Sequence, residues 1–187
     1  RIKLVIAYDG TAYAGWQMQK TGVGVQQRVE EALGKIIRSA PRLHSSSRTD
    51  TGVHALGMVA HVDVPRAELR MPIGKLALSL NAHLDPDIRV QSAEKCAPDF
   101  HARFSAKGKR YVYRVHCGDP DPFTRPFCWP VHRPLDLVAM RAAAKVLQGR
   151  HDFRAFTAVN GPEREDTVRD LTRLDVTRRG REIRITG

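Results

Sequence analysis

Hydrophobic and polar residues follow regular periods through most of the first half of the chain. Residues 1–10 alternate, with Ile2, Leu4, Ile6 and Tyr8 on one face, which predicts a strand. The same reasoning predicts strands over 57–64 and 87–95, amphipathic helices over 25–37 and 71–84, and a short strand hidden within 42–48. This order is typical of a split βαβ layout, in which helices cover one face of a mostly antiparallel sheet.

The second half shows a similar series of elements. A strand expected over 108–118 places Tyr111, Tyr113 and Val115 on one face. The other predicted elements are a Pro-rich loop from Gly118 to Pro134, a helix over 137–149 capped by Asp136 and stopped by Gly149, and two strands within 171–187 joined at Arg179 and Gly180. The patterns therefore predict the α+β class.

Two domains are expected, an N-terminal half over 1–104 and a C-terminal half over 105–187. The chain of 187 residues is long enough for two small hydrophobic cores. It begins at Arg1 and stops at Gly187 directly after an alternating strand, so we expect the C-terminal half to be incomplete.

Basic residues outnumber acidic ones. Lys and Arg total 31 against 20 Asp and Glu, which gives a formal net charge of +11 and a pI of about 10.1. Residues 102–114 interleave basic side chains with tyrosines, as suits a nucleic-acid backbone that must be neutralised and bases that must stack. A polyanionic partner is therefore expected, although a soluble protein that merely happens to be basic is the alternative.

Composition also bears on the compartment. The apolar runs are far too short for a membrane span, and no signal peptide opens the sequence. The cysteines are three and widely spaced, at Cys96, Cys117 and Cys128. An odd number at such spacing argues against a disulfide framework and fits a reducing cytoplasm.

No cofactor or metal motif is complete. Gly22 and Gly24 are followed by Gln27 where a dinucleotide-binding fingerprint needs a third glycine. The phosphate-binding loop, the HExxH helix and the nucleophile elbow are likewise missing, and no histidine pairs with a cysteine at zinc-finger spacing. We therefore expect neither a cofactor nor a metal, and structural or surface roles for isolated histidines such as His54 and His61.

The densest run of hydroxyl and charged side chains is SSSRTDTGVHALG, residues 45–57. Asp50 has two interpretations. It forms an Asx turn that holds backbone amides, or it is a catalytic carboxylate able to act as nucleophile or base without a cofactor. In an extended backbone Arg48 would lie on the same side and keep the carboxylate ionised, and Gly52 would allow the chain to turn.

Four blocks in order resemble the TruA-type tRNA pseudouridine synthases. They are YDGTAYAGWQMQ, VGVQQRVEEAL, SRTDTGVHALGMVAH and DFHARFSAKGKRYVYR, and weaker similarity continues through LQGRHDFRAFTA. The resemblance covers nearly the whole chain. The sequence departs from the family pattern at Ser46 and Ser47, and at Met58, where the family usually has Gln. It also lacks the family's C-terminal helix with an MVRN-like motif.

The resemblance implies conversion of uridine to pseudouridine in the anticodon arm of tRNA, at tRNA positions 38, 39 and 40, without cofactor or metal. It implies that Asp50 is the catalytic nucleophile, that Arg48 helps to open the RNA and admit the target base, and that Tyr111 packs on the uracil. From periodicity alone, Tyr111 and Tyr113 are core residues of a strand. The family also implies two ferredoxin-like or RRM-like halves, a central cleft and a homodimer.

Two other functions fit parts of the sequence. A non-catalytic RNA-binding protein with an RRM-like sheet needs only exposed aromatic residues and a basic surface. A nuclease is a weaker alternative, since metal-dependent nucleases need clustered carboxylates and only Asp63 follows Asp50 nearby. Tolerance of Asp50→Asn would favour the binding protein, and dependence on magnesium would favour the nuclease.

Overall fold

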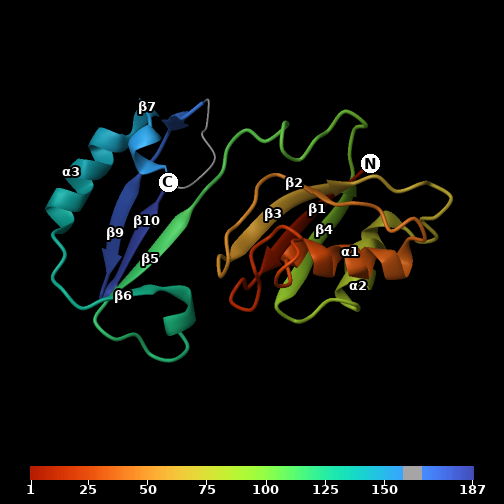
Figure 1. Cartoon of the computed structure of the whole chain (residues 1–187), viewed down its shortest axis with the longest axis horizontal. Helices are drawn as coiled ribbons and strands as arrows, with labels where there is room; N and C mark the ends of the chain where they lie inside the picture. Colours follow the sequence, from red (N-terminus) through yellow and green to blue (C-terminus); the bar gives the residue numbers. More distant parts are fainter. Residues whose placement is uncertain (158–165) are drawn as a thin grey trace. The chain divides into compact units, whose positions relative to one another are not determined.

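The computed structural model describes residues 1–157 and 166–187. The chain forms two compact units, Arg1–Lys107 (unit 1) and Gly108–Gly187 (unit 2). Each unit has its own sheet and its own hydrophobic core (Figure 1). The mixed α+β class is confirmed. That 1–104 and 105–187 are separate domains stays a prediction.

Unit 1 contains every strand and helix predicted for the first half. They are β1 (Ile2–Tyr8), α1 (Val25–Ile36), β2 (His44–Ser45), β3 (Ala55–Val62), α2 (Ile73–Asn81) and β4 (Ile88–Lys95). The strands pair antiparallel in the order β2-β3-β1-β4. The short strand expected within 42–48 is β2, which lies at the edge of this sheet.

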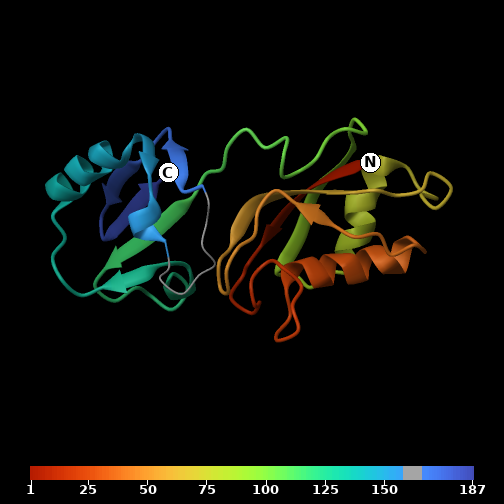
Figure 2. The same cartoon turned by 45° about the horizontal axis from the view of Figure 1, so that its top comes forward.

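The core of unit 1 lies between the sheet and its two helices. Strand β1 buries every second side chain from Ile2 to Tyr8, as its alternation predicts. Val29 and Leu33 of α1 and Leu76 of α2 belong to the same cluster, so both helices cover one face of the sheet (Figures 1 and 2). Full burial of one such aliphatic side chain stabilises the fold by about 1.5–3 kcal/mol.

Unit 2 is built around a second four-stranded sheet. Its elements are β5 (Val112–Cys117), a 3-10 turn (Arg125–Phe127), β6 (Trp129–Val131), α3 (Leu137–Leu147), β7 (Gly149–Asp152), a second 3-10 turn (Arg154–Phe156), β8 (Val168–Leu171), β9 (Asp175–Arg179) and β10 (Glu182–Thr186). The order β6-β5-β10-β9 is antiparallel except for the parallel pair β5·β6. The carboxylate of Asp136 accepts from the N–H groups of Val138 and Ala139, so the predicted helix cap is confirmed.

Four boundaries of unit 2 differ from the predictions. Strand β5 begins at Val112, although the pattern predicts a strand from Gly108. The segment predicted as a loop contains β6, an edge strand in which Pro130 needs no partner for a missing N–H. The β9–β10 turn is centred on Gly180 and Arg181, one residue late, because Arg179 still pairs with Glu182. Helix α3 ends at Leu147, and Gly149 begins the unpredicted β7–β8 pair with φ +103°.

Candidate active site

Residues 46–54 form the loop that joins β2 to β3, and this loop carries Arg48, Thr49 and Asp50. Arg48 and Asp50 are exposed, whereas Thr49 between them is half-buried. Within residues 1–157 and 166–187, neither the Arg48 guanidinium nor the Asp50 carboxylate has a hydrogen-bond or ion-pair partner. Both charged groups are therefore open to a ligand that approaches from solvent.

Thr49 anchors the 46–54 loop to unit 1. Its carbonyl oxygen accepts a 3.0 Å hydrogen bond from the Trp16 N–H, and its hydroxyl lies 2.8 Å from the Tyr8 hydroxyl. Tyr8 and Trp16 are buried, and their rings lie 5.7 Å apart. These contacts fix the backbone at Thr49, so the main chain of the two charged neighbours is anchored while their side chains stay exposed.

Two glycines allow this close approach. A Cβ on Gly10 would lie 2.1 Å from the carbonyl oxygen of Val53. Gly15 has φ +84°, and a Cβ there would lie 2.5 Å from the carbonyl oxygen of Thr49. The YDGTAYAGWQ block is thus the surface on which the 46–54 loop rests, which explains why these two motifs resemble the same family together.

The turn after Asp50 is made by the backbone. The Val53 N–H donates to the Asp50 carbonyl oxygen at 3.1 Å, and Gly52 has φ +77°, as expected of the residue that lets the chain turn. The Asp50 carboxylate holds no backbone amide among the described residues, so its interpretation as an Asx turn is wrong. Asp9 forms such a turn instead, with its carboxylate accepting from the Thr11 N–H at 2.9 Å.

Arg48 and Asp50 do not form a direct ion pair. Their charged groups lie farther apart than the 4.0 Å that defines one, although only Thr49 separates the residues. The expected alignment of the carboxylate by the guanidinium is therefore absent in this state. Both side chains are exposed on the 46–54 loop.

His54 ends the loop with a structural contact. Its Nδ1 lies 2.9 Å from an Asp9 carboxylate oxygen and accepts from the Gly10 N–H at 3.1 Å. The Thr11 hydroxyl and the Thr11 N–H, which both donate to Asp9, hold the pKa of this carboxyl below its usual range. This contact ties the start of β3 to the end of β1.

Tyr111 belongs to unit 2, where it directly precedes β5. Its N–H donates to the Gly187 carbonyl at 2.7 Å, and its carbonyl accepts from the Gly187 N–H at 3.0 Å. The side chain is 62% exposed, so it is not the core residue that periodicity indicates. Tyr113, expected to be structural, is also exposed and contacts Trp129 edge-on with ring centroids 6.3 Å apart.

Metal-binding groups do not gather in the described part of the chain. Within residues 1–157 and 166–187, no three His, Cys, Asp or Glu side chains are placed to hold a metal ion. In the same residues, no helix has the length and apolar character that crossing a bilayer requires.

Sequence comparison identifies what the chain is related to. The profile of a family described as tRNA pseudouridine synthase matches residues 4–105. A Rhodospirillum rubrum protein named tRNA pseudouridine synthase A is 45% identical over 99% of this chain and 66% of its own length. Proteins of the same name from Geobacter sulfurreducens and Frankia casuarinae are 42% and 47% identical, over 74% and 65% of their lengths.

This chain belongs to the tRNA pseudouridine synthase family. The predicted family is thereby confirmed, and its members are isomerases that act on tRNA. The profile match includes Arg48 and Asp50. Tyr111 lies beyond the profile but within the stretch that aligns with the Rhodospirillum rubrum protein, since that alignment covers 99% of the chain. The chain spans about two thirds of that relative's length.

Nothing in the sequence explained Met58, whereas the structure shows which residues it contacts. In the family motif that SRTDTGVHALGMVAH resembles, Gln is usual at this position. Met58 is 5% exposed beneath the 46–54 loop, and its sulfur lies 3.5 Å from the hydroxyls of both Ser46 and Ser47. Met58 therefore contacts both Ser46 and Ser47, which also depart from the family pattern, and its thioether acts as a weak acceptor.

Proposed function

We propose that the protein containing this chain converts uridine to pseudouridine in tRNA. In this isomerisation the N-glycosidic bond between N1 and C1′ breaks, the uracil rotates, and a bond forms between C5 and C1′. The C5 proton is lost and N1 gains a proton, so no oxidant or reductant is needed. The protein must therefore detach the uracil from the ribose, hold it while it rotates, and allow it to rejoin the ribose through C5.

The observation that carries the proposal is the state of Asp50. Its carboxylate is exposed and unpartnered among the described residues, while the backbone beside it is fixed through Thr49. A fixed, ionisable oxygen that is not used for structure suits a nucleophile or a base. Attack on the ribose, attack on the base and removal of a ribose proton are all compatible with this arrangement.

Roles in substrate binding are also proposed for Arg48 and Tyr111. A base cannot react while it is stacked, so the nucleotide must be flipped out of the RNA. Arg48, exposed beside Asp50, contacts the opened RNA and admits the target base. Tyr111, exposed and held through its backbone to Gly187, packs on the uracil.

The anticodon arm of tRNA, at tRNA positions 38, 39 and 40, is the proposed substrate region. A net charge of +11 supports a partner held mainly through its phosphates. We further propose ferredoxin-like halves flanking a central cleft, a homodimer and a cytoplasmic location. The β-α-β-β-α-β order of unit 1 supports the first of these.

Release of tritium tests this function. An unmodified tRNA transcript labelled at uridine C5 loses its label when pseudouridine forms. The wild-type protein is expected to release tritium, Asp50→Asn to release none, and Asp170→Asn to match wild type, since Asp170 is exposed on β8. Binding of tRNA without tritium release by the wild type would instead support the RRM-like RNA-binding protein.

A further inference from the structure

The turn after Asp50 rests on the segment that follows β1. The Gly52 N–H donates to the Tyr13 carbonyl oxygen at 3.3 Å. Gly10 packs against the next residue, since its missing Cβ leaves room for the Val53 carbonyl oxygen. The Tyr13 N–H donates to the Gly10 carbonyl oxygen at 3.0 Å, so both contacts come from one closed turn, the 9–13 turn. The position of the Asp50 backbone therefore depends on where this turn lies.

Asp87 fixes the 9–13 turn at both ends. Its carbonyl oxygen accepts from the Asp9 N–H at 2.9 Å, and its carboxylate Oδ1 accepts from the Tyr13 hydroxyl at 2.7 Å. Asp87 directly precedes β4, whose first residue pairs with the last residue of β1, so both segments lie at the same end of the sheet (Figure 1). One residue of the α2–β4 connection therefore holds the first and the last residue of the turn that supports the Asp50 backbone.

The Tyr13 side chain is buried, and its hydroxyl is a lasting donor. The residue is 6% exposed, and its ring belongs to the hydrophobic core of unit 1. Burial, followed by the hydrogen bond to Asp87, raises the pKa of Tyr13, so the hydroxyl stays protonated at neutral pH. A phenylalanine ring would fill the same core position. The hydroxyl is therefore needed only for its contact with Asp87.

We propose that Tyr13 and Asp87 are positioning residues for the reaction at Asp50. The inference rests on the proposed function and extends it to two residues that act through the main chain. The Tyr13 hydroxyl is held by Asp87, and the Tyr13 carbonyl oxygen holds the Gly52 N–H. Together with the anchor at Thr49, these contacts hold the main chain on both sides of the Asp50 carboxylate. Because misplacing a reacting group by about 1 Å can cost about 100-fold in rate, losing either partner should slow the chemistry.

Single-turnover formation of pseudouridine by site variants tests the proposal, with tRNA binding and the melting temperature measured in parallel. Tyr13→Phe and Asp87→Ala each remove one partner of the hydrogen bond. Asp87→Asn keeps an oxygen that can accept from the Tyr13 hydroxyl. The matched control is Asn81→Ala in α2. It removes two hydrogen bonds between the Asn81 side chain and the Val90 backbone, so it destabilises unit 1 without touching the 9–13 turn.

Tyr13→Phe and Asp87→Ala are expected to lower the single-turnover rate by about 10- to 100-fold while tRNA binding is retained. Asp87→Asn should keep a rate close to that of the wild type. Asn81→Ala should keep the wild-type rate although its melting temperature falls. A Tyr13→Phe variant as fast as Asn81→Ala would overturn the proposal. Equal rates for Asp87→Asn and Asp87→Ala would also overturn it, since the hydrogen bond would then not be the cause.

Hydrogen exchange of the Gly52 amide separates failure of this inference from failure of the proposed function. This N–H bonds the Tyr13 carbonyl oxygen, so its exchange should be faster in Tyr13→Phe than in the wild type and unchanged in Asn81→Ala. Exchange at the wild-type rate in Tyr13→Phe would overturn the inference. Faster exchange in Tyr13→Phe, with no pseudouridine formed by the wild type, would support the anchoring of the turn while rejecting the proposed function.

Discussion

The carbonyl oxygen of Thr49 accepts a hydrogen bond from the main-chain N–H of Trp16 at 3.0 Å. This contact fixes the residue between Arg48 and Asp50 to the backbone of Trp16, a residue from a distant part of the sequence whose side chain is buried. The backbone of the proposed active site is therefore anchored, while the charged side chains on either side of Thr49 have no partner among the described residues.

The Tyr8–Thr49 hydroxyl contact should matter for both stability and rate. Burial raises the pKa of Tyr8, so its hydroxyl stays protonated and available as a donor at neutral pH. Tyr8→Phe and Thr49→Val are each expected to lower the free energy of unfolding by about 0.5–1.5 kcal/mol and to lower kcat. Urea titrations and single-turnover assays measure both effects.

A double-mutant cycle checks whether that contact is the cause. The pair Tyr8→Phe/Thr49→Val should cost less than the sum of the single variants, because both remove the same hydrogen bond. Strict additivity would contradict the account. Tyr113→Phe, at an exposed tyrosine in unit 2, is the control and should leave stability unchanged.

The glycine contacts under the 46–54 loop yield a second prediction. Gly10→Ala places a Cβ 2.1 Å from the Val53 carbonyl oxygen, so the backbone must move. We expect it to lower the free energy of unfolding by about 1–3 kcal/mol and to reduce activity further than stability explains. Gly74→Ala is the matched control. It meets nothing within 4 Å, lies in α2, and should stabilise by about 0.5–1 kcal/mol.

His61 makes the stability of unit 1 depend on pH. Burial, followed by the charges of Arg1, His101 and His44, lowers the pKa of His61 to about 4, while Asp63 opposes the shift. Its folded pKa lies below the unfolded value of about 6.5, so the unfolded state binds the proton more tightly. The contribution of His61 to the free energy of unfolding is therefore fully present above pH 6.5. It is lost as the pH drops from 6.5 to 4.

The size of this effect can be measured with urea titrations across that range. A shift from 6.5 to about 4 corresponds to a loss of at most about 3 kcal/mol at the acid end. His61→Leu should flatten the curve between pH 6.5 and 4. His83→Leu, at an exposed histidine, should not. A wild-type curve that rises toward acid would contradict the assignment.

The role of the Met58 contacts in positioning the 46–54 loop can be tested by substitution. Met58→Gln supplies an amide oxygen to Ser46 and Ser47 in place of the sulfur, so kcat should stay at the wild-type level. Met58→Leu keeps a similar volume without the acceptor. It should lower kcat while costing less than about 1.5 kcal/mol of stability. Equal kcat values for both variants would show that the serine contacts do not position the loop.

The periodicity of the sequence was enough to predict unit 1. Its strands and helices each bury a regular stripe, such as the alternate residues of β1 from Ile2 to Tyr8, and local spacing reveals such stripes. The cap at Asp136 was equally local. Strand β6 was missed because three residues containing Pro130 show no period, and only pairing with β5 makes them a strand.

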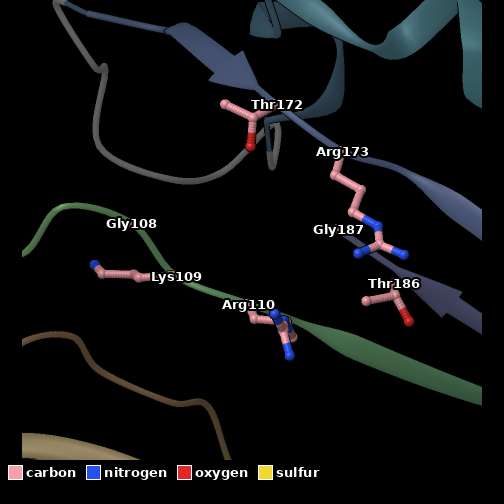
Figure 3. A pocket seen from close by; sticks show the side chains of 7 residues that line it. All are labelled: Gly108, Lys109, Arg110, Thr172, Arg173, Thr186 and Gly187. Carbon is pink, nitrogen blue, oxygen red and sulfur yellow. The ribbon is translucent and has the colours of Figure 1, made fainter.

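Some features of the candidate site could be predicted from the sequence and others could not. One short motif was enough to select Arg48, Asp50 and Gly52, because these residues lie within five positions of one another. The anchor at Thr49 could not be selected in this way, because its partners Tyr8 and Trp16 are distant in sequence and one of the contacts is a main-chain hydrogen bond. Sequence patterns likewise did not group Arg173 with Lys109 and Arg110, which line one hollow of unit 2 only because of its fold (Figure 3).

The central claim is that the Asp50 carboxylate performs the chemistry, and one measurement tests it most directly. Single-turnover formation of pseudouridine, mapped along an unmodified tRNA, is compared for wild type, Asp50→Asn and Asp170→Asn, with tRNA binding measured in parallel. The account predicts product in the anticodon arm for wild type and Asp170→Asn. For Asp50→Asn it predicts a rate at least about 10²–10⁴-fold lower with tRNA binding retained. Product formation by Asp50→Asn at the wild-type rate would contradict it.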